Sequence, residues 1–333
     1  MLRISKCAVS GAVVLACTLA PTASETAAPA TFGIPQDVQA ITAIENAMAS
    51  ETDIDKVMPN FADDATMADM MGPGWYEGRD QIRAAVAPQL KGLQSIGYRM
   101  EEITVASDGE FACAAMRIHF DATKTDKSQV HMTIRQLDGF KKVGGQWRIV
   151  QQHISVPADA KTGAPMFDDK TPGRGALAWA RPSAPGPAVS ATAAKPEINA
   201  WLEASEVPKS FAEMLTYYGP GDDEIIFDFN SPGELRGRKE MRAFYAPQFT
   251  GVRNMEIHIP VRHIDSDGKF GVEISQQNLQ LNMKNGTSQR VSFRQSDCVR
   301  RVGSKWYSFF EMGSFPVDPK TGKSVMLDPA GFK

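Results

Sequence analysis

Apolar residues recur with two different periods along the first half of the chain. At residues 38–49, 54–61 and 79–90 they return at helical spacing. From Tyr98 onward they alternate with polar residues, so that Ile118 and Phe120 share one face of a predicted strand. A glycine pair then predicts a turn into a last strand over residues 147–155. Helices followed by antiparallel strands are typical of an α+β domain, with helices packed on one face of a bent sheet and a pocket between the two.

The sequence also contains a long internal repeat. Residues 63–169 overlay residues 222–328 without a gap, and 30 of the 107 pairs in this repeat alignment are identical. Average composition gives unrelated sequences only about 6% identity. A stretch rich in proline, alanine and glycine separates the copies. We therefore predict two α+β domains at residues 32–169 and 196–318, a linker at 170–195 and a tail at 319–333.

Residues 1–25 have the layout of a secretory signal peptide. Arg3 and Lys6 precede an apolar run at residues 7–20, which small residues and Pro21 follow. The run is too short to span a bilayer comfortably. We therefore expect cleavage and a periplasmic or secreted product with no membrane span. The alternative is a loosely matching lipoprotein site, which would leave Cys17 lipidated.

Composition narrows the choice of partners. The 36 basic and 39 acidic residues give a formal net charge of -3, so there is no basic excess for binding nucleic acid. No cysteine lies in a CxxC pair or beside a histidine at zinc-ligand spacing, and we expect neither a metal nor a cofactor. After cleavage only Cys113 and Cys298 remain. They can form a disulfide in an oxidising compartment, but two buried free thiols are the favoured interpretation.

Asp69 is the first candidate for chemistry. It follows a short predicted strand and has Met67, Met70 and Met71 close by in the sequence. Apolar surroundings disfavour the charged form of a carboxyl group and raise its pKa toward the range of a general base. The alternative from the local sequence is a strand-end aspartate that makes turn hydrogen bonds.

Asp138 and His153 lie on the two later strands. Counting in twos places Asp138 on the face of Met132 and Ile134, where a protonated carboxyl group can donate a hydrogen bond to a developing oxyanion. His153 has the same parity as Trp147, and an imidazole in the pocket is a further acid or base near neutral pH. The alternatives are an exposed strand end for Asp138 and a hydrogen-bonded histidine at a strand end for His153.

Aromatic and apolar residues complete the predicted pocket. Trp75 and Tyr76 follow a Gly-Pro-Gly turn and are expected to close over a flat apolar ligand, with the Tyr76 hydroxyl as a polar contact. Ordinary loop packing is the alternative. Met67, Met132 and Ile134 are expected to contact the ligand in the same pocket.

These residues resemble one known family. Residues 62–69 (ADDATMAD), 78–82 (GRDQI) and 147–155 (WRIVQQHIS) are similar to the SnoaL-like and ketosteroid-isomerase-like branch of the nuclear-transport-factor-2-like superfamily. The resemblance implies two tandem cone-shaped α+β barrels, each with helices on a strongly bent antiparallel sheet. Such barrels commonly dimerise through the sheet, so we expect an intramolecular pseudo-dimer or a homo-oligomer.

The resemblance also implies roles for single residues. Asp69 matches the aspartate base of the family, and Asp228 is its counterpart in the second copy. Asp138 matches the oxyanion-hole aspartate, with Asp297 as its counterpart. Glu45 stands where the isomerase carries a tyrosine, which speaks against steroid double-bond migration.

Three functions from different classes remain. The leading hypothesis is a cofactor-independent isomerase or lyase that abstracts a proton from a small hydrophobic, cyclic or aromatic molecule in the first domain. Asp69 would be the base, Asp138 the oxyanion donor and His153 an auxiliary acid or base. The alternative is an exported protein that binds a hydrophobic molecule without altering it. The third interpretation is a structural or assembly module.

Overall fold

The chain folds as two tandem α+β barrels, which confirms the predicted fold class. The computed structural model describes residues 30–32, 34–71, 74–159, 162–174, 188–219 and 224–325. The expected signal peptide, with Cys17, lies outside the described residues.

The first unit, domain 1, has three α-helices and a seven-stranded sheet. The helices are α1 (Pro35–Ala49), α2 (Ile54–Val57) and α3 (Arg79–Lys91), with a 3-10 turn at Met58–Asn60. The strands are β1 (Ala30–Phe32), β2 (Phe61–Ala68), β3 (Trp75–Glu77), β4 (Leu93–Ser107), β5 (Phe111–Lys124), β6 (Gln129–Val143) and β7 (Gln146–Ser155). Their order in the sheet is β1-β4-β5-β6-β7-β2-β3, and the pairs β1–β4 and β2–β7 are parallel.

Domain 2 repeats this plan. Its helices are α4 (Ala191–Ser205), α5 (Phe211–Met214) and α6 (Gly237–Gly251), with a 3-10 turn at Leu215–Tyr217. Its strands are β8 (Ile225–Phe227), β9 (Leu235–Arg236), β10 (Val252–Ser266), β11 (Phe270–Met283), β12 (Ser288–Val302) and β13 (Lys305–Ser314), in the order β10-β11-β12-β13-β8-β9. In the repeat alignment, both bounds of each long strand β4–β7 coincide with those of β10–β13. Helix α4 begins at Ala191, inside the stretch that the sequence assigns to the linker.

The spacing of apolar residues explains which face α1 presents to the sheet. Val38, Ile41 and Glu45 lie on one side of the helix and are buried, while Pro35 stands in the first turn, where a missing N–H breaks no helical hydrogen bond. A carboxyl group on this otherwise apolar stripe is unusual. It brings Glu45 into the interior of domain 1.

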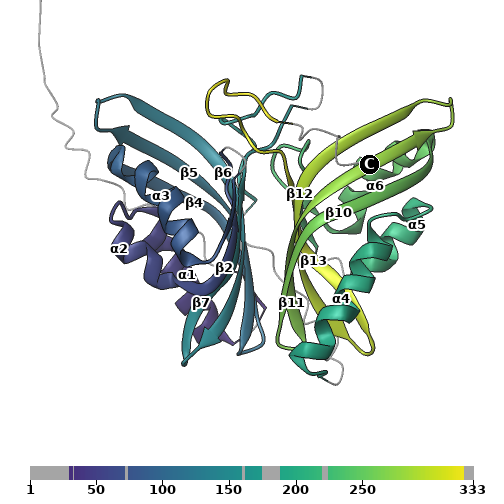
Figure 1. The fold of residues 1–333 in the computed structure, drawn as a ribbon, viewed down its shortest axis with the longest axis horizontal. Coiled ribbons are helices and arrows are strands. Elements are labelled where there is room, and N and C mark those ends of the chain that lie inside the picture. The colour runs from purple at the N-terminus through teal and green to yellow at the C-terminus, as the bar shows by residue number, and fades with distance from the viewer. Residues whose placement is uncertain are drawn as a thin grey trace, which may run out of the picture.

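The two sheets pack back to back, with helices α1–α3 and α4–α6 on the outer sides (Figure 1). Strand β11 contacts both β5 and β7 across this interface. Strands β5, β7 and β11 are therefore covered on two faces, by the helices of their own domain on one side and by the other domain on the opposite side. Alternate residues face the interior of their own domain or the domain interface.

Main-chain hydrogen bonds tie the domains together in a pseudo-symmetric way. The Ala158 amide donates to the Phe229 carbonyl at 2.8 Å, and the Val317 amide donates to the Met70 carbonyl at 2.9 Å. Each pair is the image of the other in the repeat alignment. In each domain, the segment that follows the last strand therefore makes a main-chain hydrogen bond to the other domain.

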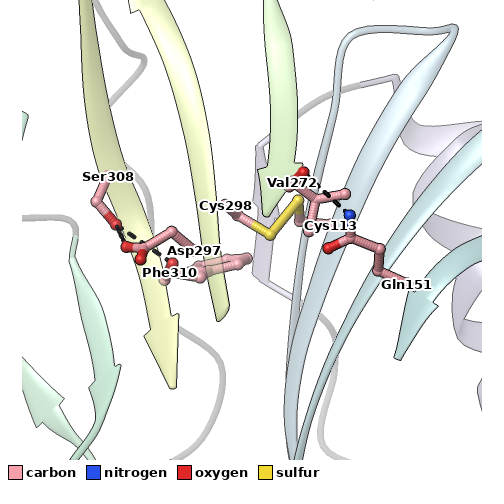
Figure 2. The surroundings of a disulfide bond; sticks show 7 residues. All are labelled: Cys113, Gln151, Val272, Asp297, Cys298, Ser308 and Phe310. Carbon is pink, nitrogen blue, oxygen red and sulfur yellow. Dashed lines mark hydrogen bonds between the residues drawn. A yellow bond between two sulfur atoms is a disulfide. The ribbon is translucent and has the colours of Figure 1, made fainter. Parts of the chain in front are cut away.

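A disulfide between Cys113 on β5 and Cys298 on β12 also joins the sheets, with Cα atoms 6.4 Å apart (Figure 2). This corrects the expectation of two free thiols. The pseudo-symmetric contact brings Val272 against Gly139, where a Cβ atom on the glycine would lie 2.6 Å from a Val272 methyl carbon. The two sheets lie very close together at both of these pseudo-symmetric contacts. Only a glycine fits at position 139, and a disulfide joins the sheets at the other contact.

None of the helices in the described part of the chain combines the length and the apolar character that a membrane span requires.

Candidate functional site

A cavity of about 790 Å³ lies in domain 1, between helices α1 and α3 and the inner face of the sheet. Its walls are mainly apolar, and they include Met67, Met132 and Ile134, which the sequence analysis expected there. The volume is within the usual range for a small-molecule site. Asp69 and Tyr76 also line it.

Asp69 is held at the wall of this cavity by the turn that follows β2. Its amide donates to the Gly74 carbonyl at 2.7 Å, and one carboxylate oxygen accepts a hydrogen bond of 2.9 Å from the Gln89 side chain on α3. The residue is only 4% exposed. Burial raises the pKa of the Asp69 carboxyl group, while Gln89 and the Arg294 guanidinium of domain 2 oppose the rise.

Tyr76 and Trp75 leave β3 in opposite directions. Tyr76 pairs with Met67 and lines the cavity, where burial and then the charge of Asp69 raise the pKa of its phenol. Trp75 instead lies against His263 of domain 2, with ring centroids 5.8 Å apart. The expectation that Trp75 closes over a ligand is therefore corrected, since neighbouring residues of a strand point to opposite faces.

Asp138 has the predicted parity but lies behind the cavity wall. It is fully buried, and one of its oxygens accepts hydrogen bonds of 2.9 Å from both Gln136 and Gln152, whose side chains do line the cavity. Gln136 also donates to Glu45 at 3.2 Å. Glu45 lines the cavity, so of these two carboxyl groups Glu45 faces it and Asp138 does not.

Glu45 and Asp138 form a carboxyl pair. Burial, and then the neighbouring Asp138 carboxyl group, raise the pKa of Glu45 well above its ordinary value. Burial raises the pKa of Asp138 to about 7, against hydrogen bonds from Gln152, Glu45 and Gln136. Two close carboxyl groups in an apolar interior do not both ionise at neutral pH, so the pair retains a proton.

His153 does not reach the cavity, which corrects its assignment as an auxiliary acid or base there. Its ring faces domain 2, with Nδ1 at 2.9 Å from the Ser296 hydroxyl and Nε2 at 2.7 Å from the Ser314 hydroxyl. Burial lowers the pKa of the imidazole well below its ordinary value, and the guanidinium of Arg294 acts in the same direction. A neutral ring accepts from one serine and donates to the other.

The counterparts in domain 2 have different surroundings. Asp228 accepts a hydrogen bond of 2.9 Å from the Tyr245 hydroxyl, which stands where domain 1 has Val86. Asp297 accepts from Gln295 at 2.8 Å and from Ser308 at 2.7 Å, and burial raises its pKa to about 6. Both carboxyl groups are thus engaged by their own domain.

Five polar residues that line the cavity were not singled out from the sequence: Glu51, Gln89, Lys124, Gln136 and Gln152. Gln89 and Gln136 are identical in both copies of the repeat, which was an available signal. No group of three or more histidine, cysteine, aspartate or glutamate side chains suited to a metal ion occurs in the described residues. The cavity therefore offers acids, amides, a phenol and the amine of Lys124, set in a mainly apolar wall.

The fold and the cavity define a class of α+β barrel domain with a mainly apolar interior, and the sequence comparison gives the family. The model of the SnoaL-like domain matches twice, at residues 38–159 and 197–318. The chain therefore belongs to the SnoaL-like domain family and contains the domain in two copies. No curated protein matches the chain.

Each of the solved structures that follow matches a stretch of this chain about as long as one domain. An NTF2-like protein of unknown function from Pseudomonas putida KT2440 has 24% identity and a TM-score of 0.35, over 40% of this chain and 92% of the other. An NTF2-like superfamily protein from Salmonella enterica has 20% identity and a TM-score of 0.33, over 38% and 94%. A candidate dehydratase of the NTF2-like family from Streptomyces avermitilis has 13% identity and a TM-score of 0.32, over 36% and 96%.

Proposed function

We propose that domain 1 is a cofactor-independent isomerase or lyase that abstracts a proton from a small hydrophobic, cyclic or aromatic molecule. The observation that carries the proposal is the position of Asp69, a buried carboxyl group at the wall of a large and mainly apolar cavity. Such surroundings raise the pKa of Asp69 and make its carboxylate a stronger base.

The other groups at the cavity fit the same reaction class. Asp69 takes a proton from carbon, and Gln89 fixes the orientation of its carboxylate. Glu45, which stays protonated against Asp138, is the donor for the negative charge that develops on the substrate, in place of the role first assigned to Asp138. The proton then returns to a different atom in an isomerase, or a leaving group departs in a lyase.

The substrate class follows from the wall of the cavity. Met48, Met67, Met70, Met71 and Met132 all line it. Thioethers adapt to ligand shape and make favourable contacts with aromatic rings. Phe61 and Phe120 add aromatic surface. The cavity therefore suits a neutral ring-containing molecule.

We further propose that the protein acts outside the reducing cytosol. The Cys113–Cys298 disulfide supports this location, because such bonds persist in oxidising compartments. The predicted signal peptide agrees with it.

Base-promoted elimination of 5-nitrobenzisoxazole tests the proposal. In this reaction a base removes the proton from carbon, the N–O bond breaks and a coloured cyanophenolate is released. We expect Asp69→Asn to lower kcat/KM by about 100-fold, the usual scale of a general base. Asp228→Asn is the matched control and should leave the rate unchanged.

A second measurement separates catalysis from binding. Fluorescence titration with the neutral probe N-phenyl-1-naphthylamine should give the same Kd for wild type and Asp69→Asn, because most of the cavity wall is apolar. Probe binding without any turnover that depends on Asp69 would favour the binding protein. Turnover that Asp69→Asn leaves intact would rule out this aspartate as the base.

A further inference from the structure

We propose that domain 2 completes the candidate site of domain 1, with Arg294 on β12 as a positioning residue that orients the Asp69 segment from across the domain interface. The inference rests on the proposed function of domain 1 and deepens it. It gives the second copy of the fold a role at the first copy's site.

The hydrogen bonds at the interface carry the proposal. The Arg294 guanidinium donates to the main-chain carbonyl of Asp69 at 2.5 Å and to that of Gly74 at 3.2 Å. The Val317 amide donates to the carbonyl of Met70 between them. Domain 2 therefore holds three carbonyl groups of the short turn that presents the Asp69 carboxylate to the cavity.

Gly74 shows how closely this contact is fitted. Its φ is +54°, in the left-handed region that favours glycine. A Cβ atom there would lie 2.5 Å from the Asp69 carbonyl oxygen and 2.9 Å from the Arg294 guanidinium. The turn and the arginine thus leave no room for a side chain. Pro319, from the same segment of domain 2 as Val317, also lines the cavity.

Arg294 brings charge as well as hydrogen bonds. It is only 1% exposed, and burial lowers the pKa of its guanidinium to about 10, so it is still protonated at neutral pH. The acidic groups that raise this pKa are Asp69 and Tyr76. Removing the guanidinium therefore takes away a positive charge that favours the Asp69 carboxylate.

The groups that face Asp69 come from three elements. Arg294 approaches from β12 and Tyr76 from β3, while the neutral Gln89 amide approaches from α3. His153 on β7 lies near Arg294 and stays neutral because burial lowers its pKa. Arg294 is the cation that acts on the titration of Asp69.

The repeat supplies a matched control. Arg135 of domain 1 corresponds to Arg294 and donates to the Asp228 carbonyl at 2.7 Å. It too is fully buried. A variant at Arg135 removes an equivalent contact from the same interface but leaves the Asp69 turn untouched.

The test is a carbon-13 NMR titration of aspartate carboxyl groups in full-length protein labelled at aspartate. The Asp69 resonance is assigned by its loss in Asp69→Asn. We expect Arg294→Met to move the Asp69 midpoint upward by about one pH unit, the lower end of the effect of a nearby opposite charge. Arg135→Met should leave the Asp69 midpoint unmoved, and Arg294→Lys, which keeps the charge, should restore it toward the wild-type value.

An unmoved Asp69 midpoint in Arg294→Met, with the same loss of stability as in Arg135→Met, would overturn the proposal and leave Arg294 as an interface contact only. If Arg294→Met does not fold, Arg294→Lys still decides the positioning role. Both hydrogen bonds come from Nη1 of the planar guanidinium, whereas the ammonium group of a lysine ends a more flexible stem. Arg294→Lys should therefore hold the turn less well and lower turnover of 5-nitrobenzisoxazole at saturating pH with little change in KM. Unchanged turnover in that variant would also overturn the proposal. The titration needs no catalysis, so its outcome is independent of whether domain 1 proves to be an enzyme.

Discussion

Where domain 1 has its cavity, domain 2 carries larger aromatic side chains. Met70, Ile134 and Val86 correspond in the repeat to Phe229, Phe293 and Tyr245. The Phe229 ring lies 5.3 Å from that of Phe293 and 4.8 Å from that of Phe315, measured between centroids. The two domains therefore have nearly the same strands but different interiors.

One contact of the interface is the same in both copies. Arg135 and Arg294 are identical in the two copies, and each donates to the main-chain carbonyl of the opposite candidate aspartate. Asp69 and Asp228 are identical as well. This contrast teaches that the pairing of the two barrels retains the arginine contact, although other interface positions differ, such as His153 and Met312. The apolar residues under the helices differ as well, toward different ligands or toward a filled core.

One interior arrangement of a glutamine and two carboxyl groups occurs in both domains, although the glutamate stands at a different place on the helix. Glu45 lies within α1, whereas Glu206 follows the last residue of α4. Gln295 nevertheless donates to Glu206 at 2.6 Å and to Asp297, just as Gln136 donates to Glu45 and Asp138. A glutamine between two carboxyl groups is thus built twice, from different positions on the helix.

The disulfide is a point at which the pseudo-symmetry breaks, and its removal should have the largest effect on stability. The double variant Cys113→Ala/Cys298→Ala is expected to lose about 2–4 kcal/mol of unfolding free energy, because the bond closes a loop between cysteines 185 residues apart. Urea unfolding followed by tryptophan fluorescence measures the change.

Reduction of the wild-type protein serves as the control for this variant. It should lower stability to the same level, while binding of N-phenyl-1-naphthylamine persists because the arginine contacts remain. Equal stability of the oxidised wild type and the double variant would show that the two sheets do not depend on this bond.

The aromatic residues that fill the interior of domain 2 can be introduced at the equivalent positions of domain 1. Giving domain 1 the aromatic residues of domain 2, as Met70→Phe/Ile134→Phe, should weaken N-phenyl-1-naphthylamine binding about 100-fold, or about 2.7 kcal/mol. The two added rings take up space in the cavity that both residues line. Fluorescence titration measures the Kd.

The reciprocal variant Phe229→Met/Phe293→Ile is the matched control. It changes the equivalent positions of domain 2 and should leave the domain 1 Kd unchanged. If the domain 1 variant still bound the probe with the wild-type Kd, the cavity of domain 1 would not be the binding site.

Most of the fold was predictable because two signals can be read directly from the sequence. These are the internal repeat and the alternation of apolar residues along each strand. The repeat alignment is reproduced in the bounds of the long strands of both domains. Parity also placed Met132, Ile134 and Gln136 on one face, and all three line the cavity. The pairing of Cys113 with Cys298 was not predictable in this way, since the two cysteines are not equivalent in the repeat.

His153 shows where parity fails. Ile149 pairs with Phe140 and Gln151 pairs with Gly139, so Val150 is an extra residue in β7. This β-bulge reverses the alternation along the rest of the strand. Gln152 therefore faces the cavity and His153 faces domain 2. Residues on both faces of β7 are buried, so the alternation of apolar and polar residues is weak there. A single inserted residue therefore cannot be recognised from the sequence.

Replacing Glu45 by glutamine should give the smallest change, and one that depends on pH. Burial and Asp138 raise the folded-state pKa of Glu45 above the unfolded value of about 4.3. The stability that its protonated form contributes is fully present below that unfolded pKa and is lost as pH rises toward the folded pKa. Glutamine has nearly the same shape and does not titrate. The Glu45→Gln variant should therefore match wild type within about 0.5 kcal/mol near pH 4 and gain on it by about 1 kcal/mol per pH unit above that.

Urea unfolding at a series of pH values measures this difference, and domain 2 again provides the comparison. Burial, followed by the charge of Asp297, raises the pKa of Glu206 to about 8, so Glu206→Gln should gain on wild type with the same sign. Because each glutamate lies beside an aspartate that the same glutamine contacts, the two variants should respond alike although their helices place the acid differently. A difference between Glu45→Gln and wild type that stays constant with pH would mean that Glu45 is ionised in the folded protein. Glu45 would then not be a hydrogen-bond donor to a substrate in domain 1.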